Sequence, residues 1–132
     1  MLRIVAAVSG VYDLVVGAVL LLGTSWMAAT FGVAPPEPVI HAKLNAIFLI
    51  CIGIGYYLPW RDPVRYRAYQ WIMGPLLKGA GALAFLIDYW VNASPKAFLL
   101  FAASDGVLAL WTLAALALTS GQRAEGKGQR HE

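Results

Sequence analysis

Asp13, Lys78 and Asp105 are ionisable residues that lie inside long apolar stretches of the chain. A single charge near the centre of a bilayer costs at least about 2.5–3.5 kcal/mol, so such residues usually face a partner, a cavity or a pathway. Because the two carboxylates and the ammonium have opposite signs, one shared cluster would avoid the free-energy cost of burying three separate charges. We therefore expect these side chains to meet in a cluster with one formal negative charge, which protonation of one carboxyl would remove.

Small residues share the helix face of each of these charges. Side chains three, four or seven positions apart lie on one face of a helix. The neighbours are Gly10 and Gly17 for Asp13, Gly74, Gly81 and Ala82 for Lys78, and Ala102, Ala109 and Thr112 for Asp105. Small residues let helices approach closely in membranes, so the charges are predicted to point into a bundle and away from lipid.

The elements that would position these charges are four long apolar stretches. The chain has 132 residues and is 60% hydrophobic and 13% charged, whereas soluble domains average about 25% charged residues. A hydrocarbon core of about 30 Å needs about 20 helical residues. We predict an all-α fold, an antiparallel bundle of four transmembrane helices in one domain (residues 1–120) with a disordered cytoplasmic tail (residues 121–132). The predicted spans are residues 4–22, 40–58, 71–90 and 97–118.

Positive residues gather on one side of this predicted bundle. Lys43 and Lys96 are the basic residues of the opposite side. By the positive-inside rule, both termini and the loop 59–70 are predicted to be cytoplasmic. The net charge of +3 is thereby explained by topology and does not indicate nucleic-acid binding. The residues of the positive side are Arg3, Arg61, Arg65, Arg67, Arg123, Lys127 and Arg130.

The predicted topology decides which charges pair directly. A helical side chain leans toward the N-terminus of its own helix. In an antiparallel bundle, Asp13 and Lys78 then lean toward the same membrane face, while Asp105 leans toward the other. We therefore predict a direct pair between Lys78 and Asp13. Asp105 is expected to join this pair through water or through a polar side chain, Tyr12, Ser104 or Thr112.

The first connection contains an apolar patch before a proline-rich segment. Trp26, Met27 and Phe31 form the patch, and prolines follow at 35, 36 and 38. We predict a short helix lying in the outer membrane interface between the first two spans, followed by an extended proline-rich segment that ends it. An unstructured loop is the alternative.

The cytoplasmic loop contains a helix start signal. Asp62 precedes Pro63, which combines a favoured N-cap residue with proline at the first helical position. We predict that the third helix begins near Pro63. Arg61, Arg65 and Arg67 are then placed to contact anionic lipid head groups. A ligand phosphate or carboxylate is the alternative partner for these arginines.

Metal and haem sites lack ligands in this sequence. Cys51 is the single cysteine, and the two histidines are His41, at the outer membrane face, and His131, in the tail, so no histidine pair lies in the bilayer. Haem, zinc and iron–sulfur sites need thiolate or imidazole ligands in sets that these residues cannot supply. We expect no metal and no cofactor.

Several short motifs resemble a known group of proteins. These motifs are GIGYY at 53–57, WRDPVRY at 60–66, GPLLKG at 74–79 and SDGV at 104–107. Together they resemble a widespread group of small bacterial four-helix membrane proteins without an established activity. In that group a G-Y-x(3–4)-R-D-P-x-R turn leads to G-x-x-G-K and then to N-D in the last helix.

The resemblance extends over about residues 8–113 and has two departures. Pro75, Leu76 and Leu77 stand where a glycine would precede the lysine, and Ser104 stands where asparagine is usual. The overall plan is also similar to DoxX-like proteins, whose name comes from a quinone-linked oxidoreductase subunit. These resemblances imply a multi-pass protein of the bacterial inner membrane.

Three classes of function remain open for this pattern. The leading hypothesis is a non-enzymatic integral membrane protein, such as an accessory or redox-linked subunit, with a buried polar pocket around Lys78. A proton-coupled or small-solute transporter that uses Asp13 and Asp105 is the first alternative. A quinone- or lipid-modifying enzyme is the second, although no nucleophile and base are visible. An ion pair that only fixes helix register would show the same pattern. The expected partners are the bilayer and either a larger membrane complex or further copies of this chain.

Overall fold

The chain is helical along nearly all of its described length. The computed structural model describes the backbone of residues 1–128 and the side chains of residues 1–120. Within this part, η1 is a π-helical segment and η2 is a short 3-10 turn. In chain order the elements are α1 (Leu2–Leu22), α2 (Thr24–Thr30), α3 (Ile40–Gly55), α4 (Tyr57–Arg61), α5 (Arg67–Trp71), η1 (Ile72–Lys78), α6 (Gly79–Asn92), η2 (Lys96–Phe98) and α7 (Leu99–Gly128).

Adjoining elements combine into long helices that could each cross a membrane. In the described residues there are four of them, with 21 to 26 residues each. About 20 apolar helical residues suffice to cross a bilayer. The predicted all-α fold with four long apolar helices is therefore confirmed, and the chain is a multi-pass membrane protein by helix length and hydropathy. The four helices are Leu2–Leu22, Ile40–Arg61, Arg67–Asn92 and Lys96–Ser120.

The predicted tail overlaps the end of α7, whose backbone is described as far as Gly128. The structure does not describe the side chains of residues 121–132 or the backbone of residues 129–132. The disordered tail of 121–132 therefore stays a prediction.

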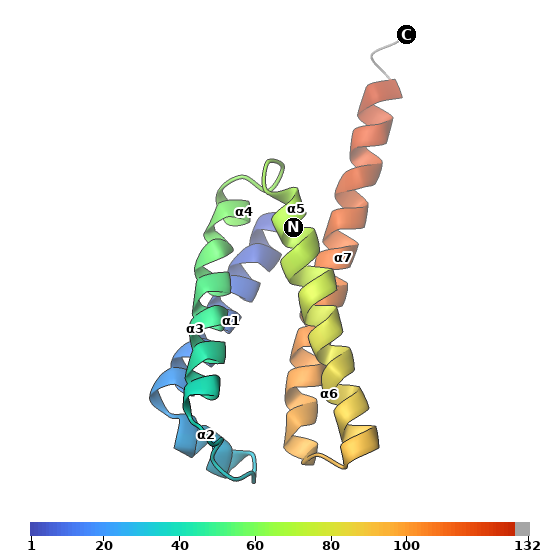
Figure 1. Ribbon diagram of the computed structural model, residues 1–132. Coiled ribbons are helices and arrows are strands. Elements are labelled where there is room, and N and C mark those ends of the chain that lie inside the picture. Colours follow the sequence, from blue (N-terminus) through green and yellow to red (C-terminus); the bar gives the residue numbers. More distant parts are fainter. Residues whose placement is uncertain (129–132) are drawn as a thin grey trace.

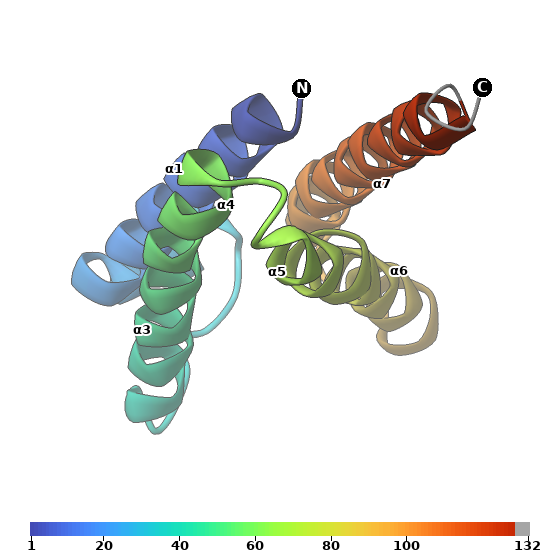
Figure 2. The same ribbon diagram turned by 90° about the horizontal axis from the view of Figure 1, so that it is seen from above.

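The long helices are arranged as two packed pairs. α1 packs on α3 and α4, while α6 and η1 pack on α7. Seen from above, these groups diverge from one another (Figure 2). α1 also contacts α7, which joins the pairs. At this junction a small apolar core, Leu2, Val5, Ala115 and Leu116, is covered on one side by the partly buried Trp111.

The α1–α3 pair is held at short range by glycines. A Cβ atom on Gly17 would lie 2.8 Å from Ile50 Cγ1, and one on Gly53 would lie 2.9 Å from the Gly10 carbonyl oxygen. Such distances are too short for real Cβ atoms. Small residues here let the two backbones approach, as the sequence pattern around Asp13 predicted.

The predicted short helix after the first span is present as α2. It lies at the end of the bundle where the chain also turns from α6 into α7 (Figure 1). Trp26 of α2 is exposed, whereas Phe31, at its C-terminal end, stacks on Phe98 and Phe101 with ring centroids 5.7 and 5.0 Å away. α2 is therefore attached to the start of α7 through aromatic rings.

The helix start signal at Asp62 is only partly realised. Asp62 Oδ1 accepts hydrogen bonds from the backbone N–H groups of Val64 (3.2 Å) and Arg65 (3.0 Å), as an N-cap does. However, α5 begins at Arg67 and not near Pro63, so that predicted boundary is wrong. The reason is Tyr66, whose φ of −101° and ψ of 28° interrupt the helical backbone after one turn.

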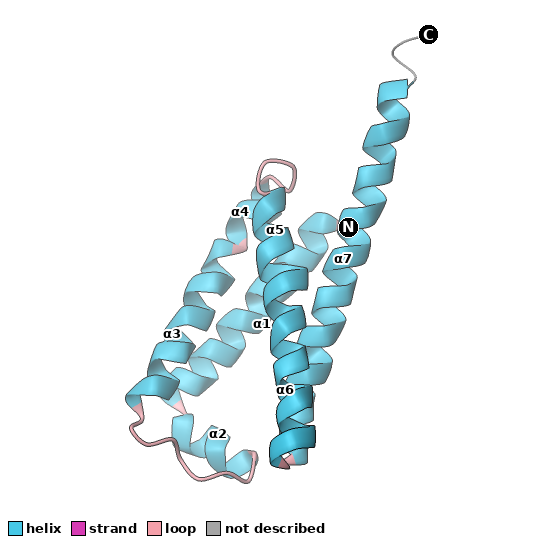
Figure 3. Cartoon of the chain, turned by 45° about the vertical axis from the view of Figure 1, so that its right-hand side comes forward, coloured by secondary structure: helices cyan, strands magenta, loops and turns pink. Residues whose placement is uncertain are grey.

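A π-helical segment, η1, separates α5 from α6 within one continuous rod (Figure 3). Pro75 lies inside it. Proline has no N–H to donate, and its ring clashes with the carbonyl four residues earlier, so a regular α-helix cannot continue undisturbed. π-helical turns often occur at functional sites, and Lys78 is the last residue of this one.

Candidate functional site

Lys78 joins Asp13 and Asp105 into one cluster. Lys78 Nζ lies 2.5 Å from Asp13 Oδ1 and 3.7 Å from Asp105 Oδ1. Asp13 and Lys78 are buried, with side-chain exposures of 1% and 5%, while Asp105 is 19% exposed. The three charges therefore meet between α1, η1 and α7, as their types and positions predicted.

The predicted direct pair of Lys78 with Asp13 is present, but the predicted indirect route to Asp105 is wrong. The Asp105 carboxylate lies within ion-pair distance of the same ammonium. The prediction considered only the direction in which each side chain leans along its helix. It did not consider the length of the lysine side chain. Its Nζ lies over the Tyr12 ring, 5.0 Å from the ring centroid. From this position it contacts Asp13 of α1 and Asp105 of α7.

Tyr12 and Ser104 lie beside the cluster and join α1 to α7. Their hydroxyl oxygens are 2.7 Å apart. Ser104 Oγ also lies 2.8 Å from the Leu100 carbonyl, to which it donates. Because serine has a single hydroxyl proton, Tyr12 donates to Ser104 whenever Ser104 donates to the Leu100 carbonyl.

Thr112 is not brought to the charges. Its hydroxyl donates to the Leu108 carbonyl at 2.7 Å, one turn earlier in α7. Its side chain packs against Gly74, where an added Cβ would lie 2.6 Å from Thr112 Cγ2. Thr112 therefore belongs to the close contact between η1 and α7.

A cavity of about 450 Å³ opens next to the cluster. It lies between α1 and α3 on one side and η1, α6 and α7 on the other. Its polar side chains are those of the cluster together with Tyr12 and Asn45, and its remaining walls are apolar. Lining residues Asn45, Phe48 and Leu77 are exposed, so the cavity reaches the surface along α3 and η1. The lining residues are Tyr12, Asp13, Val16, Leu20, Met27, Asn45, Phe48, Leu49, Ile52, Leu77, Lys78, Gly81, Phe85, Phe98, Phe101 and Asp105.

Aromatic rings form the end of the cavity that faces α2. Phe85 of α6 lies 5.5 Å from Phe101 and 6.1 Å from Phe98, measured between ring centroids. Phe31 completes the group by stacking on the same two rings. Sequence reasoning missed Phe85, Phe98, Phe101 and Asn45, and it assigned Phe31 only to the apolar patch of the first connection. A signal was available in the i, i+3 spacing of Phe98 and Phe101, but it did not indicate Phe31 or Phe85.

Buried polar atoms without hydrogen-bond partners also lie beyond the cluster. Asp13 Oδ2, Ser9 Oγ and Tyr56 Oη are buried and have no hydrogen-bond partner among the described residues. Ser9 and Asp13 are four residues apart and share one face of α1. Ser9 and Asp13 are also polar neighbours of the Tyr56 hydroxyl. This region therefore has unused hydrogen-bonding capacity.

The three loop arginines have different surroundings. Arg61 is exposed, and Arg65 is exposed with its guanidinium 5.6 Å from the Tyr66 ring centroid. Arg67 donates hydrogen bonds to Thr119 Oγ1, the Leu116 carbonyl and Ser120 Oγ, at 2.8, 2.5 and 2.5 Å. Arg67 thus ties α5 to α7.

No protein-family model, curated protein or solved structure matches the chain. The helices alone therefore classify the protein: its described residues form a small four-span membrane protein. Within the described part of the chain, no group of three or more His, Cys, Asp or Glu side chains is arranged to hold a metal ion.

Proposed function

We propose that this protein is a non-enzymatic membrane protein that binds a small amphipathic molecule between its two helix pairs. The observation that supports this is the cavity of about 450 Å³ with charged groups at one end and aromatic rings at the other. Small-molecule sites commonly enclose about 300–1,000 Å³, with mostly apolar walls and few polar groups that fix orientation.

The two ends of the cavity suit the two parts of such a molecule. An apolar body would pack on Phe85, Phe98 and Phe101, while a polar group would reach Asp105 and Asn45. Asp105 supports this arrangement because it lines the cavity and is the most exposed of the three charges. An ion pair that served only to fix helix register would not need a cavity beside it.

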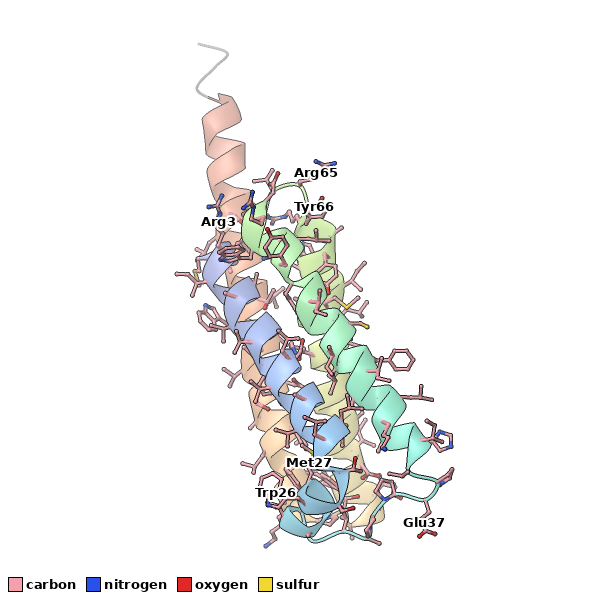
Figure 4. The ribbon with its side chains drawn as sticks, turned by 90° about the vertical axis from the view of Figure 1, so that its left-hand side faces the viewer. Arg3, Trp26, Met27, Glu37, Arg65 and Tyr66 are labelled. Atoms are coloured by element: carbon pink, nitrogen blue, oxygen red, sulfur yellow. The ribbon has the colours of Figure 1, made fainter. Side chains whose placement is uncertain are left out.

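The membrane setting is part of the same proposal. Arg3 and Arg65 lie at one end of the bundle, and Trp26, Met27 and Glu37 lie at the other (Figure 4). The positive-inside rule then puts the arginine end and both termini in the cytoplasm of a bacterial inner membrane. In this orientation α2 lies in the outer interface, and the exposed Arg61 and Arg65 meet lipid head groups.

The kind of partner that we propose rests on the resemblance noted in the sequence. An accessory or redox-linked subunit, as the similarity to DoxX-like proteins implies, would present the bound molecule to a larger membrane complex. Co-purification of a second protein from native membranes would support that role. A single-component preparation would leave the chain as a binding protein acting alone or with copies of itself.

Solute transport is a second candidate, favoured by the buried unpaired atoms. Ser9 Oγ of α1 and Tyr56 Oη, from the C-terminal end of α3, are further buried polar atoms outside the cavity lining. A transporter needs polar groups on both sides of its central site. Substrate flux into liposomes that is abolished by Asp13→Asn would favour this candidate.

Cavity filling tests the binding proposal. The probe is the neutral dye 6-propionyl-2-(dimethylamino)naphthalene, measured by fluorescence in lipid nanodiscs, with empty nanodiscs as the baseline for partition into lipid. Wild-type protein should show saturable binding, and Gly81→Leu should remove it because Gly81 lines the cavity. Ala80→Leu is the matched control, since Ala80 is exposed and is not a lining residue. Equal binding by wild type and Gly81→Leu would refute the proposal.

A further inference from the structure

We propose that the cavity selects an organic cation with an aromatic or apolar body, and that the Asp105 carboxylate is its counter-ion. This inference rests on the proposed binding function and adds the chemical class of the ligand. It follows from the net charge of the cluster, from the unequal exposure of its members and from the aromatic walls.

The first step concerns charge. The cluster has two carboxylates and one ammonium, and it therefore has one formal negative charge. The other described residues that line the cavity are uncharged. A monovalent cation would bring the site to neutrality, whereas an anion would add to an uncompensated charge in a region of low dielectric constant.

The second step identifies the available carboxylate. Asp13 is 1% exposed and lies 2.5 Å from the ammonium, so its charge is already paired. Asp105 lies at 3.7 Å and is 19% exposed. Asp105 Oδ2 is 3.5 Å from the position that a Cβ atom would occupy on Gly81, a residue of the cavity wall. The missing side chain of Gly81 thus leaves one oxygen of Asp105 open to the cavity.

The third step concerns Lys78, which is the obvious candidate for an anion site. Its side chain is 5% exposed, and its ammonium is engaged by both carboxylates and lies over the Tyr12 ring. An anion approaching from the cavity would meet Asp105 before it met this ammonium. Lys78 therefore lowers the charge of the cluster without presenting a positive surface.

The fourth step favours an organic cation over a metal ion. Cations are attracted to the faces of aromatic rings within about 6 Å, more strongly where water is excluded. Tyr12, Phe85, Phe98 and Phe101 all line the cavity. A hydrated metal ion would not fill apolar walls, whereas an ammonium or phosphonium with hydrocarbon groups would contact both the rings and the carboxylate.

Two probes of the same shape and opposite charge test this inference. Tetraphenylphosphonium and tetraphenylborate each present four phenyl rings, and their binding is measured by equilibrium dialysis against protein in nanodiscs of phosphatidylcholine. Wild-type protein should bind the phosphonium saturably and should not bind the borate. Asp105→Asn should weaken phosphonium binding by about tenfold or more, the usual effect of losing a partly buried charged contact. Asp88→Asn is the matched control, because it removes the same charge from α6 outside the cavity.

The neutral dye separates failure of this inference from failure of the binding proposal. Asp105→Asn should leave dye binding intact, because it keeps the shape of the side chain and the aromatic walls. Equal binding of the two ions, or phosphonium binding that survives either Asp105→Asn or Gly81→Leu, would overturn the cation inference even where the dye still binds. Loss of saturable binding for the dye and the phosphonium alike in the wild type would overturn both proposals.

Discussion

Lys78 is held unequally by its two carboxylates. The contact with Asp13 is short and buried, whereas the contact with Asp105 is longer and partly open to the cavity. Breaking a buried ion pair from one side costs more than breaking an exposed one, because the remaining charge has no water around it. Asp13 should therefore matter most for stability and Asp105 most for binding.

Removing Asp13 should destabilise the protein strongly. Asp13→Asn is expected to cost about 3–5 kcal/mol of unfolding free energy, because the buried ammonium would then depend on Asp105 alone. Asp105→Asn should cost less, since the short pair with Asp13 remains. The double change Asp13→Leu with Lys78→Met should recover much of the stability lost by Asp13→Asn, because apolar replacement of both partners can be neutral.

Thermal melts in detergent of Asp13→Asn, Lys78→Met and the double variant would decide this prediction. Recovery in the double variant would indicate a direct energetic interaction between the two residues. Simple additivity would mean that Asp13 and Lys78 do not interact, and the cluster would have to be reassigned around Asp105.

Two neighbouring tyrosines should respond oppositely to loss of their hydroxyl groups. Tyr56 Oη is buried and has no partner among the described residues, so Tyr56→Phe should be neutral or slightly stabilising. Tyr69 donates to the Ile52 carbonyl at 2.7 Å, and Tyr69→Phe should cost about 1 kcal/mol. Thermal melts of the two variants provide the comparison. A larger loss for Tyr56→Phe would indicate a bound water or ion on that hydroxyl.

At the scale of the elements, packing distance is set by glycines that have no room for a side chain. Gly53 and Gly10 face each other where α3 crosses α1, and Gly74 faces Thr112 where η1 meets α7. Gly10 lies three residues before Asp13, and Gly74 lies four residues before Lys78. They keep α1 and η1 in the positions from which Asp13 and Lys78 can meet.

Adding one methyl group at such a contact should be costly. A Cβ on Gly53 would lie 2.8 Å from Leu14 Cγ and 2.9 Å from the Gly10 carbonyl oxygen, so Gly53→Ala should destabilise by about 1–3 kcal/mol through overpacking. Gly79→Ala is the matched control, because its Cβ would meet only Ala109 Cβ, at 3.9 Å. That variant should be neutral or stabilise by up to about 1 kcal/mol through helix propensity. Comparable melting temperatures for both variants would contradict the close approach of α1 and α3.

At the scale of the whole molecule, the even number of spans puts both ends of the described bundle on one membrane face. That face has the arginines of the N-terminus and of the loop between α4 and α5 (Figure 4). The cavity faces the opposite end, where α2 and η2 lie. In the orientation proposed above, a ligand would therefore enter from the outer side or from the outer leaflet.

Reporter fusions test this orientation. Green fluorescent protein fused to the C-terminus should fluoresce, and alkaline phosphatase fused there should be inactive, because the positive-inside rule predicts a cytoplasmic end. Alkaline phosphatase inserted between α6 and η2, at Ala93, should be active and serves as the control. An active phosphatase at the C-terminus would reverse the topology and put the cavity on the cytoplasmic side.

The sequence by itself determined the helices and the meeting of the buried charges. Helix number follows from local hydropathy and length, which do not depend on neighbours. The contact of Lys78 with Asp13 was also predictable, because isolated charges are so unfavourable in a bilayer that opposite signs must find each other. The start of α5 was not predictable, because Tyr66 leaves the helical conformation after the expected cap at Asp62.

Only the tertiary structure decided the form of the site. Asp105 contacts Lys78 directly because the long lysine side chain extends between α1 and α7. The periodicity of the sequence does not give the distance between those helices. Phe31 and Phe85 meet Phe98 and Phe101 from separate elements. The cavity is lined by residues of both helix pairs, so its form depends on how the two pairs are placed relative to one another. Side-chain type and spacing specify which faces are apolar or charged, whereas the space left between those faces is a property of the packed assembly.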